Sequence, residues 1–100
     1  MQANTAFVLE NPFRMGSGGY SAVLWCRRGP ADVAGEVDGV LHVRETISYG
    51  GGKPSMWTVM FNPLADHEEA WLRLHDALEE YARVSVLLRD VFGDEEAVVN

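Results

Sequence analysis

The chain lacks several features that would assign it to a well-defined class of protein. A single cysteine, Cys26, among 100 residues excludes an internal disulfide. No apolar run approaches the roughly 20 residues that a membrane-spanning helix needs, and the first residues lack the basic and apolar segments of a secretory signal. Because the length suits one domain, we expect residues 1–100 to form a single cytoplasmic domain that does not associate with membranes.

Basic residues are also scarce. Eight Lys and Arg stand against fifteen Asp and Glu, which gives a net charge of −7, and ten of the acids lie in residues 62–100. Affinity for nucleic acid comes largely from Lys and Arg that neutralise phosphates, and anionic membranes attract the same residues. We therefore expect no direct nucleic-acid binding, whereas a protein partner with a basic surface suits this charge.

No segment matches a motif for catalysis or for a cofactor. Residues 16–19 lack the third glycine and the following helix of a dinucleotide-binding loop, and Pro54 follows Lys53 where a phosphate-binding loop has Ser or Thr. The residue types that bind zinc do not have the spacing of a common zinc site; they are Cys26, His42, His67 and His75. The sequence therefore predicts a protein that is not an enzyme, with no catalytic residues, no cofactor and no metal.

The apolar pattern changes near residue 62. Before it, stretches rich in strand-forming residues are separated by Gly and Pro clusters, and alternation over residues 36–48 predicts that Leu41 and Ile47 share a buried face. After it, one helical pattern continues to Phe92. We predict an α+β fold: an antiparallel sheet of about four strands in residues 5–61, a long C-terminal helix over about 63–92 packed on one face, and an acidic tail at 93–100.

The helix has two possible starts and a long apolar stripe. Asn62 with Pro63, or Asp66, can cap its N-terminus. The stripe alternates spacings of four and three: Ala70, Leu74, Ala77, Tyr81, Val84, Leu88 and Val91. Around residues 84–88 the helix is apolar on nearly every side, more than one sheet can cover. We therefore predict a possible homodimer, and its interface residues are Val84, Leu87, Leu88 and Val91.

The candidate partner-binding residues are acids of the helix and one tryptophan. The helical period places Asp76, Glu79 and Glu80 on one exposed side, opposite the apolar stripe, with Glu68 and Glu69 one to two turns earlier. Trp25 lies on a strand with bulky residues on both faces, so the sequence leaves open whether Trp25 or Tyr20 faces outward. An exposed tryptophan is typical of the residues that dominate protein interfaces.

These observations favour a small, acidic, non-enzymatic protein-binding module or inhibitor that occludes a basic, nucleic-acid-binding surface of a partner. Anti-CRISPR and toxin-immunity proteins act in this general way, although no motif of this chain matches them. Two alternatives stay open, because fold and size do not imply function. One is a homodimeric structural or assembly subunit, and the other is a small-molecule-binding or enzymatic domain with its site between sheet and helix.

Overall fold

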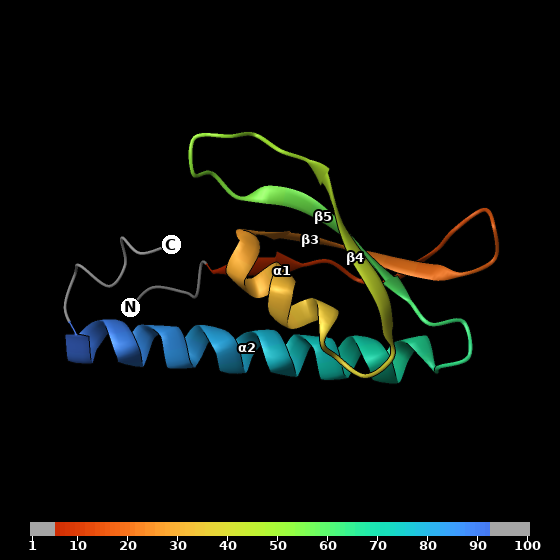
Figure 1. The fold of residues 1–100 in the computed structure, drawn as a ribbon. Helices are drawn as coiled ribbons and strands as arrows, with labels where there is room; N and C mark the ends of the chain where they lie inside the picture. Colours follow the sequence, from red (N-terminus) through yellow and green to blue (C-terminus); the bar gives the residue numbers. More distant parts are fainter. Residues whose placement is uncertain (1–5, 93–100) are drawn as a thin grey trace.

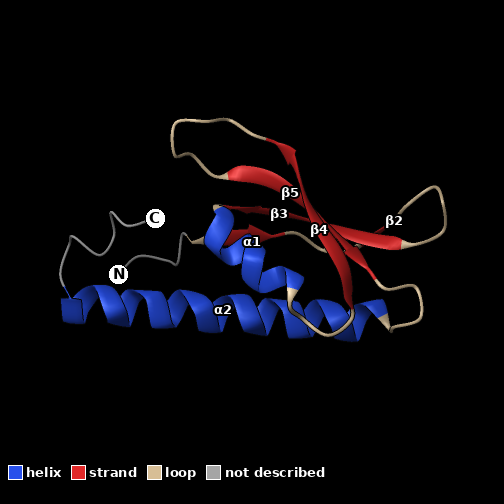
Figure 2. Ribbon diagram, in the orientation of Figure 1, coloured by secondary structure: helices blue, strands red, loops and turns tan. Residues whose placement is uncertain are grey.

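Residues 6–92 form one antiparallel sheet with two helices on one side. The computed structural model describes residues 6–92, with side chains up to Ser85. The strands and helices follow one another along the chain (Figures 1 and 2): β1 (Phe7–Leu9), β2 (Phe13–Arg14), β3 (Tyr20–Cys26), α1 (Arg28–Gly35), β4 (Val40–Ile47), β5 (Ser55–Phe61) and α2 (His67–Phe92). The predicted α+β class and the long C-terminal helix on one face are confirmed, with five strands rather than about four.

The central strands of the sheet are β3 and β5. The order is β1-β3-β5-β4, and β2 pairs with the first residues of β3, beyond the segment that pairs with β1. Since β3 and β4 are both antiparallel to β5, they run parallel to each other with β5 between them. Helix α1 connects them, which makes a split β-α-β unit.

The core lies between the sheet and α2. Alternate residues of β3 and β5 point toward the helices, and α2 presents a row at spacing four: Ala70, Leu74, Leu78 and Ala82, each at most 5% exposed. The predicted stripe had Ala77, Tyr81 and Val84 in this place. Ala77 and Tyr81 are only half-buried, and Val84 is 42% exposed. Since an α-helix has 3.6 residues per turn, each step of four residues turns about 40° around the helix axis. The buried row therefore winds obliquely around α2 and departs from the straighter predicted stripe.

Residues 28–35 form helix α1, which was not predicted from the sequence. Gly29 and Pro30 form one of the Gly and Pro clusters that were expected to separate strands, and β3 does end just before them. Proline is also tolerated in the first turn of a helix, where its missing N–H has no partner to lose. Ala31 and Ala34 then bury one side of α1 in the core. A side chain at Gly29 would collide with the Tyr81 hydroxyl, so α1 and α2 meet closely there.

Strand β4 does not keep the predicted alternation. It begins at Val40 instead of residue 36, and its register against β5 shifts between Val40 and His42 and again between Glu45 and Ile47. Each β-bulge adds one residue and moves the following side chains to the other face. Leu41 is therefore 54% exposed and Ile47 43% exposed, and the prediction that both are buried is wrong.

Helix α2 begins at the second predicted start and not near residue 63. Asp66 is its N-cap: the Oδ1 atom accepts hydrogen bonds from the backbone N–H of Glu68 at 2.9 Å and of Glu69 at 3.3 Å. The Asn62 side chain instead accepts a bond from the Leu64 N–H, which forms a turn before the helix. The predicted acidic tail at 93–100 lies outside the described residues.

Gly39 provides a stability test of the contact between α2 and the turn before β4. Its φ of +101° is unfavourable for other residues, and a Cβ there would lie 2.7 Å from the Ala70 Cβ. We expect Gly39→Ala to lower the free energy of unfolding by about 3 kcal/mol, since strain and overpacking add. Gly35→Ala is the matched control, because nothing lies within 4 Å of its Cβ position. Urea denaturation measures both, and equal stabilities would contradict this account.

Candidate functional site

All five predicted acids of α2 are exposed: Glu68, Glu69, Asp76, Glu79 and Glu80. We call them the acidic helix side. It is directed away from the sheet because the core row occupies the opposite side of the helix. Two of the acids have basic neighbours. His75 Nε2 lies 3.7 Å from Glu79, and Arg83 forms an ion pair with Glu80. Such exposed pairs contribute little to stability, and the binding role of the five acids stays a prediction.

Trp25 lies on the opposite side of the molecule. Its β3 neighbours Leu24 and Cys26 are fully buried under the helices, so the alternation of the strand directs Trp25 to the outer face, away from α1 and α2. Tyr20 is on the inner side, where its ring stacks on His67 at 3.6 Å between centroids. This resolves the alternative between Trp25 and Tyr20, and it separates Trp25 from the acidic helix side.

An apolar row crosses the outer face through Trp25. Residues that are Cα partners share a face, and the register aligns four of them across the sheet: Val8, Trp25, Met56 and Ile47. Val8 is 57% exposed and Ile47 43% exposed, while Trp25 and Met56 are half-buried. Neither helix covers this row, because both lie on the other side of the sheet (Figure 2).

A second row with both polar and charged residues runs beside the apolar row. Glu10 donates its N–H to the Val23 carbonyl, Val23 is the Cα partner of Thr58, and Thr58 is that of Arg44. We call these four the mixed row. The two rows are linked at one edge, where the Trp25 indole Nε1 donates to Glu10 Oε2 at 2.8 Å. The mixed row therefore carries an acid at the β1 edge of the sheet and a base at the β4 edge.

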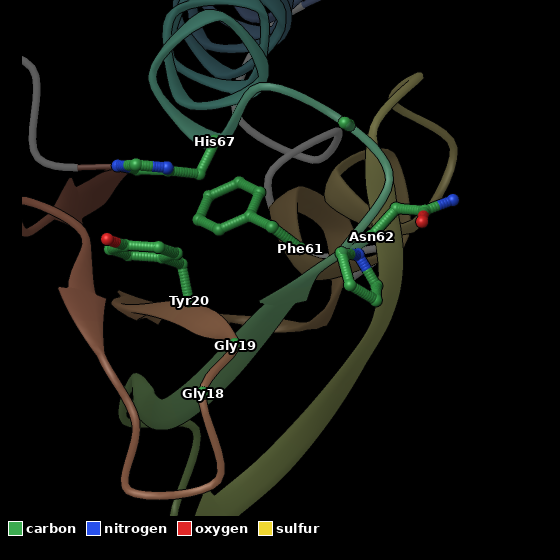
Figure 3. Close-up of a pocket in the computed structure, with 8 residues that line it drawn as sticks. Gly18, Gly19, Tyr20, Phe61, Asn62 and His67 are labelled. Atoms are coloured by element: carbon green, nitrogen blue, oxygen red, sulfur yellow. The ribbon is translucent and has the colours of Figure 1, made fainter.

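The surface of the described residues is hollowed near the ends of the sheet and beside α1. One hollow, about 120 Å³, lies where the Tyr20 and His67 rings face each other beside Phe61 (Figure 3). The second, about 350 Å³, opens between α1 and β4, where the Arg28 guanidinium lies 5.6 Å from the Trp57 ring centroid. Pockets for small ligands range from about 300 to 1,000 Å³, so the first is below this range and the second is near its lower end.

The cysteine and two of the three histidines, His67 and His75, pack against other side chains in the part of the chain that the structure describes, whereas His42 is exposed. No group of three His, Cys, Asp or Glu side chains there could hold a metal ion. His67 stacks on Tyr20, and His75 lies against the Phe7 and Trp71 rings. Burial raises the pKa of the Cys26 thiol to about 12; a hydrogen bond with the Ala31 backbone opposes this shift, and the charge of Asp32 adds a smaller contribution that raises the pKa.

The predicted dimer residues fall mostly outside this description. Val84 is exposed on α2. Leu87, Leu88 and Val91 lie in the part of α2 whose side chains are not described.

Neither helix of the described residues combines the length and the apolar character that a membrane-spanning segment needs.

Most residues of the outer face were not predicted as a binding surface, although one signal of this surface is visible in the sequence. Val23 and Trp25 on one central strand, and Met56 and Met60 on the other, are apolar at the positions where a half-solvated sheet usually has polar residues. Comparison with other proteins adds no assignment, because no protein-family model, curated protein or solved structure matches the chain.

The Cys26 thiol provides a chemical test of the core. We expect it to resist a thiol-specific reagent at neutral pH in the folded protein, since its side chain is 0% exposed and its pKa of about 12 leaves almost no thiolate. The thiol should react once guanidinium unfolds the chain, and reagent absorbance measures both rates. Cys26→Ala is the blank, and rapid native labelling would contradict the described burial.

Proposed function

We propose that this chain is a non-enzymatic protein-binding module that occludes a basic surface of a partner protein. The observation that supports the proposal is the acidic helix side of α2, where five carboxylates are exposed on one continuous helix. From Glu68 to Glu80 they cover about 18 Å at 1.5 Å per residue. The partner surface that suits them is rich in Lys and Arg, such as one that holds nucleic-acid phosphates, and covering it would inhibit the partner.

The position of these acids on a regular helix strengthens the proposal. Their backbone is fixed by intrahelical hydrogen bonds and by the core row beneath, so the backbone loses little conformational entropy on binding. Leu72, 58% exposed, lies among them and supplies an apolar contact. Charges at the rim of an interface chiefly raise the association rate, while buried apolar contacts slow dissociation.

A second candidate function is that of a homodimeric structural or assembly subunit. The apolar row on the outer face favours it, because exposed apolar patches mark interaction sites. The two candidates use opposite sides of the molecule. Both can therefore hold for the same protein, and each can be tested alone.

Reversing charges on the acidic helix side tests the first proposal. We expect Asp76→Lys, Glu79→Lys and Glu80→Lys together to slow association with a basic partner by about tenfold or more at low salt, with a smaller loss as salt rises. The fold should persist, since these residues are exposed. The measurement is affinity capture from the host with each tagged variant, followed by association kinetics with the protein that co-purifies.

The matched control reverses three other exposed acids: Asp32, Glu36 and Glu45. It makes the same change in net charge on α1, its C-cap and β4, and none of the three residues belongs to α2. Binding by this control with a rate close to that of the wild type would locate the contact on the acidic helix side. An equal loss in both variants would show an effect of total charge and contradict the proposed surface.

A further inference from the structure

The outer face of the sheet has apolar residues where water would favour polar ones. In a sheet with one face in water, outward residues are usually polar. Here four of the six outward positions on the central strands are half-buried apolar residues, Val23 and Trp25 on β3 and Met56 and Met60 on β5. The other two are Ser21 and Thr58. Exposed Val8 and Ile47 extend the surface to both edges. Trp and Met are typical of interface centres, where the ring anchors and the thioether adapts.

The outer face is complementary to a second copy of itself that is turned so that its two edges are exchanged. The mixed row begins with Glu10 at the β1 edge and ends with Arg44 at the β4 edge. The apolar row places Trp25 and Met56 on the two central strands and Val8 and Ile47 on the outer ones. A two-fold axis in the plane of the interface, parallel to the strands and between β3 and β5, exchanges the two edges and keeps each row at its own level.

We propose that the outer face binds the outer face of a second copy of this chain, related by that two-fold axis. Glu10 of each copy then faces Arg44 of the other, Trp25 faces Met56, and Val8 faces Ile47, each pair occurring twice as an isologous interface requires. Contact between sulfur and an aromatic ring is favourable. Aligned sheets pack with their strands about 30° apart, an angle that the long Glu and Arg side chains can accommodate.

Two other occupants suit the face less well. A single-stranded nucleic acid could stack a base on Trp25, but the Glu10 carboxylate bonded to the indole would repel its phosphates. A partner of one charge sign would meet a like charge at either Glu10 or Arg44. A second copy meets the opposite charge at both ends. The proposal does not depend on the acidic helix side, which points away from this interface.

A charge exchange tests the proposed pairing with purified protein alone. Sedimentation velocity over a concentration series should show a wild-type dimer. Glu10→Arg and Arg44→Glu should each weaken it by about tenfold or more, because each variant places like charges together twice. An equimolar mixture of the two variants should form dimers again, since both charge pairs of the mixed dimer then join an arginine of one copy to a glutamate of the other. Thermal unfolding of each variant checks that the fold is intact.

Two further variants and an oligothymidine test show whether the dimer forms through the outer face. Met56→Lys should give monomers, since it places a charge at the centre of the apolar row. Glu36→Arg makes the same charge change as Glu10→Arg at the exposed C-cap of α1, outside both proposed surfaces, and it should leave the dimer unchanged. A wild type that is monomeric at every concentration would overturn the inference. A dimer that Glu36→Arg weakens equally, or that the mixture of variants fails to restore, would overturn it as well. Binding of an oligothymidine by a monomeric wild type would overturn it in favour of nucleic acid. None of these results bears on partner binding by the acidic helix side.

Discussion

The structure depends on the contact between one row of α2 and the inner face of the sheet. The row has large side chains at its centre, Leu74 and Leu78, and small ones at its ends, Ala70 and Ala82, and all four are buried. Small residues let the helix approach closely, as the collision that a Cβ at Gly39 would make with Ala70 shows. The orientation of α2 about its own axis is fixed by this row, which is why its acids face solvent. Within residues 6–92 the helices occupy only one face, and neither of them covers the other face of the sheet.

The parts of the fold that could be predicted from sequence are those whose signals are local. Residues 20–26 and 55–61 are rich in strand formers, and Asp66 carries the N-cap of α2 in its own side chain. Helix α1 has eight residues and a proline in its first turn, too short for a helical stripe to stand out. The bulges of β4 were invisible for a different reason. A β-bulge has no characteristic residue type that the sequence would reveal, yet its one extra residue moves the side chains that follow to the opposite face of the sheet.

The candidate surfaces differ in the same way. Exposure of Asp76, Glu79 and Glu80 follows from the helical period once the apolar side is known. The outer face instead combines residues 8, 25, 47 and 56, and their alignment depends on strand order and register, which the sequence does not state. Trp25 was the one member found, because a tryptophan on a strand is notable by itself. Whether it faced outward depended on which side the helices cover, and that is a property of the whole fold.

Glu10 is held from two directions, and this gives the chain an internal optical probe. Its carboxylate accepts the indole N–H of Trp25, and its carbonyl accepts that of Trp71 on α2 at 2.8 Å. The third indole, Trp57, donates to the Cys26 carbonyl in the buried centre. Edge strands open before central ones in native-state fluctuations. Fraying of β1 therefore exposes two indoles to water while Trp57 stays in place, so the native tryptophan fluorescence distinguishes loosening of this edge from unfolding of the core.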